Sequence, residues 1–156
     1  MNKIKNSKGF TLMEMLIVVA IIAVLVAIAI PTFTTSLNKA RVATDEANIR
    51  SGYASVMAEI LTNQYDEKGA TAATTYVLQK DGSVMPKAAT GATGTPYTCF
   101  GDSSKVFTEE PQIAGIKVNK QWSSGKKVEY VYTPATEAVG AGATTAAANV
   151  KINIVD

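Results

Sequence analysis

The sequence predicts an α+β fold in which one long, kinked N-terminal α-helix packs on a small antiparallel β-sheet. Two observations support this fold class. An apolar run of bilayer length continues into an amphipathic stretch, and segments of alternating apolar residues follow towards the C-terminus. The first half of the helix is apolar all round and is expected to protrude, so only its amphipathic half covers the sheet.

The apolar run begins at Phe10 and ends at Ile30, and its only polar residues are Thr11 and Glu14. As a helix, the run would be ~30 Å long, which is about the thickness of the hydrocarbon core of a bilayer. A continuous apolar segment of this length predicts a transmembrane helix, although it is rich in β-branched residues.

The residues before this run carry the excess of positive charge. Lys3, Lys5 and Lys8 are three of the fifteen basic residues, and none of the thirteen acidic residues precedes Gly9. Without residues 1–9, twelve basic and thirteen acidic side chains remain. The basic pI therefore does not indicate nucleic-acid binding by the rest of the chain. A lysine-rich flank is instead typical of the cytoplasmic side of a membrane span.

Pro31 follows the apolar run, and because proline lacks an N–H group we expect a kink or a local break of the helix there. The helical pattern then continues to about Asn63, with Gly52 as its one weak position. Asp45 and Glu59 are expected mostly away from its apolar face. That face consists of Val42, Ile49, Tyr53, Val56 and Ile60, widened by Met57 and Leu61.

The second half of the chain is predicted to form strands connected by loops rich in Ala, Thr and Gly, among them residues 70–75 and 88–96. Residues Trp122–Gly125 are predicted to be a hairpin loop between two of the strands. The predicted strands are Thr75–Gln79, Ala114–Gln121, Lys126–Thr133 and Asn149–Asp156.

The chain contains one cysteine, Cys99, and no histidine. No intramolecular disulfide is possible, and we expect Cys99 to be a small buried residue rather than a reactive thiol. Without histidine, the usual general base and the commonest zinc ligand are missing. No nucleophile–base pair, metal-ligand spacing or phosphate-binding glycine loop occurs in the sequence. We therefore predict that the protein is not an enzyme and that it uses no cofactor and no metal.

Glu14 places a carboxylate in the apolar run, where it needs a partner or a proton. A charge at mid-membrane costs ~2.5–3.5 kcal/mol on insertion scales, and less near the end of a span. A cleaved secretory signal and an uncleaved signal anchor both leave this residue unexplained. Cleavage after Gly9 would create an α-amino group on Phe10. This amine could pair with Glu14 in the same helix or in a neighbouring chain.

Residues 8–31, KGFTLMEMLIVVAIIAVLVAIAIP, resemble the class III signal of type IV pilins and pseudopilins. The resemblance implies that a prepilin peptidase cuts after Gly9 and that Phe10 is then N-methylated. It implies that Glu14 neutralises the Phe10 amine of an adjacent subunit during filament assembly, and that Pro31 is the helix-disturbing proline of the family. The fold of that family is also a long N-terminal helix on an antiparallel sheet.

The function that this resemblance implies is that of a structural pilin subunit, which polymerises into a type IV pilus through its N-terminal helix. Residues 1–9 would be the leader, residues 10–34 the transmembrane and filament-core half of the helix, and residues 35–156 the globular pilin domain. Expected partners are other copies, other pilins, the prepilin peptidase, the assembly platform in the membrane, and the membrane itself. The subunit would cross the cytoplasmic membrane once before assembly and lie in an extracellular filament on the cell surface afterwards.

Two alternatives stay open. A pseudopilin of a type II secretion or competence system shares the whole N-terminal signal. Major secretion pseudopilins bind calcium, but Asp102, Glu109 and Glu110 lack Asp-x-Asp spacing, so a solvated turn is preferred here. Many Gram-negative pilins close a C-terminal loop with a disulfide, which this chain cannot form; this is more like Gram-positive pilins or a pseudopilin. The other alternative is a membrane-anchored enzyme or binding module.

A group of lysines near Trp122 is the sequence's one candidate for nucleic-acid binding, because basic residues beside an aromatic ring are typical of such surfaces. Their alternating positions distribute them over both faces of the predicted strands, where lysine discourages edge pairing. We therefore expect no nucleic-acid partner. The lysines are Lys105, Lys117, Lys120, Lys126 and Lys127.

Overall fold

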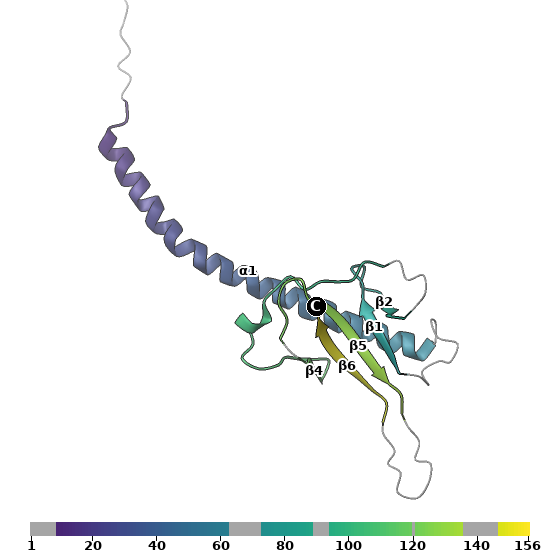
Figure 1. Cartoon of the computed structure of the whole chain (residues 1–156). Helices are drawn as coiled ribbons and strands as arrows, with labels where there is room; N and C mark the ends of the chain where they lie inside the picture. Colours follow the sequence, from purple (N-terminus) through teal and green to yellow (C-terminus); the bar gives the residue numbers. More distant parts are fainter. Residues whose placement is uncertain (1–8, 63–72, 89–93, 120, 136–146) are drawn as a thin grey trace, which may run out of the picture. The chain divides into compact units, whose positions relative to one another are not determined.

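The fold is that of one long helix and a small antiparallel sheet, as the sequence predicts (Figure 1). The chain divides into two compact units, Met1–Leu37 and Asn38–Asp156. Parts of the predicted loops, together with Asn63 and Lys120, lie outside the described residues. A computed structural model describes residues 9–62, 73–88, 94–119, 121–135 and 147–156.

Helix α1 spans Leu12–Thr62 and includes both the apolar and the amphipathic segment. Pro31 lies inside this helix without interrupting it, so the predicted local break is wrong, while the kink stays a prediction. Proline removes one backbone donor from the helix. The hydroxyl groups of Thr34 and Thr35 donate to the Pro31 carbonyl at 2.9 and 3.0 Å. The acceptor that the missing N–H would have served is the Ala27 carbonyl, one turn before Pro31, so these side-chain bonds do not replace the lost donor.

The second unit contains a four-stranded antiparallel sheet in the order β2-β1-β5-β6. Strands β1, β5 and β6 confirm three of the predicted strands to within a residue or two, whereas β2 was not predicted. A short 3₁₀ helix, η2, spans Ser103–Lys105. The strands are β1 (Thr74–Leu78), β2 (Val84–Pro86), β3 (Gln112–Ile113), β4 (Ile116–Lys117), β5 (Lys127–Thr133) and β6 (Asn149–Val155).

The predicted strand Ala114–Gln121 is confirmed only at Ile116–Lys117, because its first two residues form a turn. Ala114 and Gly115 have φ values of 53° and 80° and join β3 to β4 in a separate antiparallel hairpin. Left-handed backbone at two successive positions is what a tight hairpin requires and what an extended strand excludes. After this turn, Val118 reaches the large sheet through a parallel bridge to Ile152.

The predicted hairpin loop Trp122–Gly125 is also wrong, because β4 is not a neighbour of β5 in either sheet. The Trp122 side chain is only 1% exposed and belongs to the core. A tryptophan ring removes a large apolar surface from water when it is buried, and its N–H then needs an acceptor. The indole Nε1 of Trp122 donates to the Asp45 carboxylate at 3.1 Å.

The core lies between the amphipathic half of α1 and one face of the large sheet. The predicted apolar face of the helix is confirmed at four positions, and Tyr53 on this face is half-buried. The prediction that Met57 and Leu61 widen this face is wrong, since their side chains are 36% and 79% exposed. The buried large apolar residues of the helix are Val42, Ile49, Val56 and Ile60, and those of the sheet are Tyr76, Leu78, Val84, Val128, Tyr130, Tyr132, Val150, Ile152 and Ile154.

Gly52 is the weak helical position, and close approach of the sheet explains it. A Cβ atom on this residue would lie 2.7 Å from Cδ1 of Leu78 and closer still to the hydroxyl of Tyr130. That hydroxyl donates to the Ile49 carbonyl of α1 at 2.7 Å. A glycine costs a helix about 1 kcal/mol relative to alanine. Here it permits a buried tyrosine to contact the helix backbone.

Asp45 is buried, with 0% exposure, and its expected position away from the apolar face is wrong. Its Oδ1 accepts from the Tyr97 hydroxyl at 2.6 Å and from the Phe100 N–H at 2.9 Å. Its Oδ2 accepts from the Gly101 N–H at 2.8 Å and from Trp122 Nε1 at 3.1 Å. A buried carboxylate needs several donors to offset its lost hydration. The contacts therefore fasten residues 97–101 to α1.

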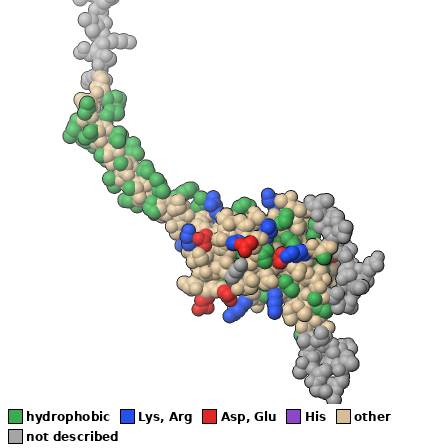
Figure 2. All heavy atoms as spheres, viewed as in Figure 1, with side chains coloured by type: hydrophobic (Ala, Val, Ile, Leu, Met, Phe, Trp, Pro, Cys, Tyr) green, Lys and Arg blue, Asp and Glu red, His purple; other side chains and the backbone are tan. Residues whose placement is uncertain are grey.

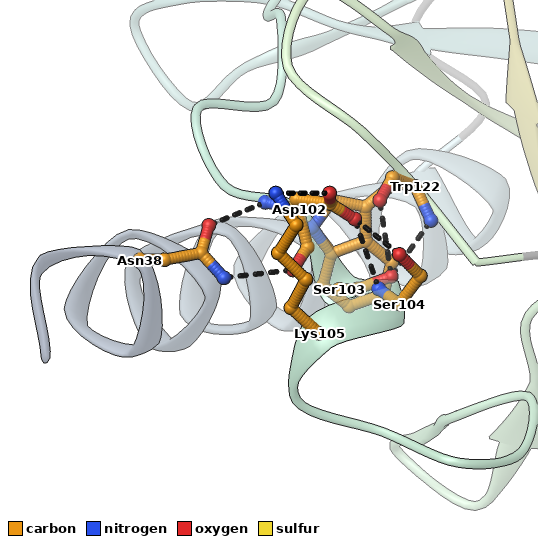
Figure 3. Close-up of polar contacts among 6 residues, drawn as sticks. All are labelled: Asn38, Asp102, Ser103, Ser104, Lys105 and Trp122. Carbon is orange, nitrogen blue, oxygen red and sulfur yellow. Dashed lines mark hydrogen bonds and ion pairs between the residues drawn. The ribbon is translucent and has the colours of Figure 1, made fainter. Parts of the chain in front are cut away.

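A second pair of bonds fastens the same loop about two turns earlier on α1 (Figure 3). The side-chain amide of Asn38 donates to the Asp102 carbonyl at 2.9 Å, and the Asp102 N–H donates to Asn38 Oδ1 at 2.8 Å. Next to it, the Trp122 N–H donates to Ser103 Oγ at 2.8 Å. We call residues 97–103 the clamped loop, because helix side chains fix its backbone.

We expect Asp45→Ala to lower the free energy of unfolding of residues 35–156 by about 3–5 kcal/mol, because it leaves several buried donors without an acceptor. Urea denaturation measures this change. Asp81→Ala is the matched control: Asp81 is exposed and accepts only local bonds from Ser83, so its effect should stay within about 0.5 kcal/mol. An equal free energy of unfolding for Asp45→Ala and for the unaltered residues 35–156 would contradict the role of Asp45 in holding the clamped loop.

Candidate assembly site

Three of the residues that the sequence singles out lie at the exposed start of α1. Gly9 and Phe10 precede the helix, and Glu14 lies in its first turn. The Phe10 side chain is 81% exposed, and no atom lies within 4 Å of the place that a Cβ on Gly9 would occupy. The Gly9–Phe10 peptide bond is therefore outside the helix and unobstructed by the described residues.

Thr11 and Glu14 form a capping box at the helix N-terminus, which the sequence reasoning missed. The Thr11 N–H and the Thr11 hydroxyl both donate to Glu14 Oε2 at 2.8 Å, and the Glu14 N–H donates to Thr11 Oγ1 at 3.2 Å. The signal was available as Thr-x-x-Glu before an apolar run. The cap satisfies first-turn donors, and the carboxylate interacts favourably with the helix dipole.

The structure thus brings Glu14 together with Thr11 rather than with Phe10. The Phe10 nitrogen is an amide while Gly9 remains attached, so this arrangement is that of the unprocessed chain. Both hydrogen bonds that the Glu14 carboxylate accepts from Thr11 end on its Oε2 atom. Among the described residues, no hydrogen bond to Oε1 is found, and the bonds from Thr11 hold the carboxylate in one orientation.

The apolar half of α1 is exposed on all sides. It is long and apolar enough to cross a membrane, and none of its most apolar stretch is buried. Figure 2 shows apolar side chains covering this half, whereas charged side chains gather over the second unit. Continuous apolar surface of this size is typical of a membrane-spanning or protein-binding segment.

The acidic residues considered for calcium do not form a shared site. The Asp102 carboxylate accepts from the Ser104 hydroxyl and forms an ion pair with Lys105 at 3.2 Å. The hydrogen bond from Ser104 lowers the pKa of Asp102. Glu109 and Glu110 are exposed. No cluster of three or more potential metal ligands occurs among the residues that the structure describes.

The Trp122 ring is not exposed beside the lysines considered for nucleic-acid binding. The Trp122 ring is buried in the core and cannot stack on a base. Lys126 forms an ion pair with the Asp156 side chain, and Lys127 donates to the main-chain oxygen of the same residue at 3.1 Å. Both lysines therefore contact Asp156, and since β5 is an interior strand of the sheet, the expected solvated strand edge does not describe their position.

Comparison with known proteins supports the N-terminal interpretation. Residues 4–30 match the family described as the prokaryotic N-terminal methylation motif. Over 52 residues, the chain is 50% identical to the type IV narrow pilus major component PilA5 of Thermus thermophilus, a match that covers 31% of this chain and 45% of that protein. The chain therefore spans less than half the length of this curated relative. No solved structure matches the chain.

The methylation motif coincides with the exposed Gly9–Phe10 segment and with most of the apolar half of α1. The second unit adds the small antiparallel sheet that such a helix covers. Over this N-terminal segment, the chain is similar to type IV pilins.

Proposed function

We propose that this protein is a structural subunit that polymerises into a type IV pilus after removal of residues 1–9 and N-methylation of Phe10. The observation that carries the proposal is the fully exposed apolar half of α1, which begins at the methylation motif. Before assembly, lipid covers this surface, and the subunit crosses the cytoplasmic membrane once. In the filament, the helices of neighbouring subunits replace the lipid by close van der Waals contact.

Glu14 gives the assembly its register in this proposal. Cleavage after Gly9 converts the Phe10 amide into an α-amino cation at the start of the helix. This cation pairs with Glu14 of an adjacent subunit, where water is scarce and charge-assisted hydrogen bonds are strong. Since Thr11 already orients the carboxylate, little side-chain entropy is lost when the second charge arrives.

The rest of the chain follows from this role. Residues 10–34 serve as membrane anchor and then as filament core, and residues 35–156 form the globular domain on the filament surface. The partners are other copies, other pilins, the prepilin peptidase and the assembly platform in the membrane. The role is structural, without enzymatic activity, and the assembled protein is extracellular on the cell surface.

A pseudopilin of a type II secretion or competence system is the alternative function, since it would share the same N-terminal segment. One observation favours the pilus: the relative from Thermus thermophilus is named as the major component of a type IV pilus. The described acidic residues form no calcium-type cluster, so they supply no separate support for the secretion alternative.

Mass spectrometry of filaments sheared from the cell surface tests the proposal. We expect the chain as a main component, beginning at an N-methylated Phe10, and we expect cells without the gene to lack these filaments in electron micrographs. A membrane-bound chain that retains its N-terminal lysines would contradict the proposal. Loss of secretion or DNA uptake with normal surface filaments would favour the pseudopilin.

A further inference from the structure

Phe100 is an aromatic side chain that the structure holds in a fixed position on the surface. Its side chain is 52% exposed, although its neighbours Cys99 and Gly101 are buried. Its N–H donates to both oxygens of the buried Asp45 at 2.9 and 3.0 Å. Its ring meets that of Tyr97 edge to face, with centroids 5.8 Å apart. An anchor held this way loses little conformational entropy when a partner covers it.

Phe100 lies beside a recess of about 360 Å³, and three residues of α1 line this recess with it. Arginine and aromatic side chains are enriched in protein–protein interfaces. We call this surface the Phe100 face; the other residues that line it are Ala40, Arg41, Thr44 and Ser124.

A groove of about 250 Å³ lies on another surface of the same unit. This volume is below the range of about 300–1,000 Å³ that is usual for small-molecule sites, so one inserted side chain fits it better than a ligand. Its described lining contains no charged residue, so an aromatic ring can enter without burying an unpaired charge. We call it the Tyr53 groove; it is lined mainly by Tyr53, Met57, Ile116, Tyr132, Asn149 and Val150.

The Phe100 face and the Tyr53 groove lie on opposite sides of the buried stripe of α1. At 3.6 residues per turn, Tyr53 is roughly 120° and Met57 roughly 160° around the helix from Arg41. The buried residues Ile49 and Val56 lie between these directions. The two surfaces are therefore separated within one chain, and each is available to a different neighbour.

We propose that Phe100 of one copy inserts into the Tyr53 groove of the next copy. The inference rests on the proposed function and adds a contact between globular domains to the helix contacts of the filament. The occupant is a second copy because the chain itself supplies both an immobilised aromatic anchor and an uncharged groove for one side chain. A contact that joins two different surfaces is heterologous, and its repetition builds an open helical filament.

Disulfide cross-linking in filaments of the full-length protein tests the contact. The variant carries Phe100→Cys and Met57→Cys, and a mild copper oxidant removes the two thiol hydrogens as the S–S bond forms. Cys99 can stay in place, because burial raises the pKa of its thiol to about 12 and shields it. We expect a ladder of covalent dimers, trimers and longer chains on non-reducing gels, since every copy would bond to two neighbours.

Matched controls separate this contact from chance collisions. Each single variant should run as a monomer on the non-reducing gel. The pair Val106→Cys and Met57→Cys should do the same; it is a matched control because Val106, like Phe100, is an exposed apolar residue but is not the proposed anchor. Surface filaments without a ladder, or an equally strong ladder from the Val106 pair, would overturn the inference and leave the proposed function intact. Absence of the parent chain from any surface filament would overturn the proposed function itself.

A single substitution gives an independent measurement. Phe100→Ser should lower the unfolding temperature of the monomer in detergent only slightly, because about half of the side chain is already exposed and the Tyr97 ring contact is what it loses. It should also make the filaments fall apart at a lower temperature than the parent filaments. Filaments of unchanged heat resistance would overturn the inference, even if the cysteine variants failed to assemble.

Discussion

Replacement of Gly9 by leucine is expected to abolish leader removal, leaving the full-length precursor in the membrane and no filaments on the cell. The physical reason is recognition by the peptidase rather than folding. A Cβ on Gly9 would have no described atom within 4 Å apart from its two chain neighbours, and residue 9 precedes the helix. The loss must therefore arise where the peptidase closes around the backbone next to the scissile bond.

The mass of the chain extracted from membranes measures this effect. Gly9→Ala should be processed slowly and Gly9→Leu not detectably, a graded response to side-chain size. Ser51→Leu is the control, because it introduces the same side chain at an exposed position within α1. The leader of this variant should be removed normally. Mature protein of normal mass from the Gly9→Leu variant would show that recognition does not depend on this glycine.

Glu14→Gln is expected to give a processed, membrane-inserted subunit whose filament yield falls at least about tenfold. A charge-assisted hydrogen bond contributes about 1.5–3 kcal/mol, and about 1.4 kcal/mol corresponds to a factor of ten in an equilibrium constant. The amide has nearly the same shape as the carboxylate, and its oxygen can still accept from Thr11. The substitution therefore removes the charge and retains much of the helix cap.

Thr11→Ala separates the two roles of the capping box. It removes the hydroxyl that bonds to Glu14 and leaves the carboxylate charged, at a cost of about 1 kcal/mol for a lost cap. We expect a much smaller loss of filaments than for Glu14→Gln, counted by electron microscopy at equal levels of mature protein. Equal losses in the two variants would assign Glu14 to helix capping, and parental yield with Glu14→Gln would refute charge pairing between subunits.

The features that sequence reasoning predicts well are those with long, uninterrupted periodicity. The apolar run needs no partner to be recognised, because its length and composition alone indicate a membrane span. Strands β5 and β6 alternate strictly, with Val128, Tyr130 and Ile152 among the residues that face the core. One apolar face of a sheet requires a cover, and the amphipathic half of α1 was the matching surface.

The errors arise where distant residues decide the local structure. Ala114 adopts a left-handed conformation that alanine seldom takes, so neither composition nor alternation indicated a turn. Trp122 was predicted to lie in a hairpin loop because of the small residues after it, although its ring fills the core. Asp45 was assigned to a solvated face, although donors more than fifty residues along the chain enclose it.

The sequence alone determined the fold class, the apolar helix and the positions of Gly9, Phe10 and Glu14, because each of these follows from nearest neighbours or from a repeating pattern along one segment. Only the tertiary structure decided that a buried carboxylate fastens the clamped loop to α1, that Phe100 is held at the surface, and that a groove lies on the opposite side of the helix. A buried charge is stable only when several donors converge on it, and that convergence exists only in three dimensions.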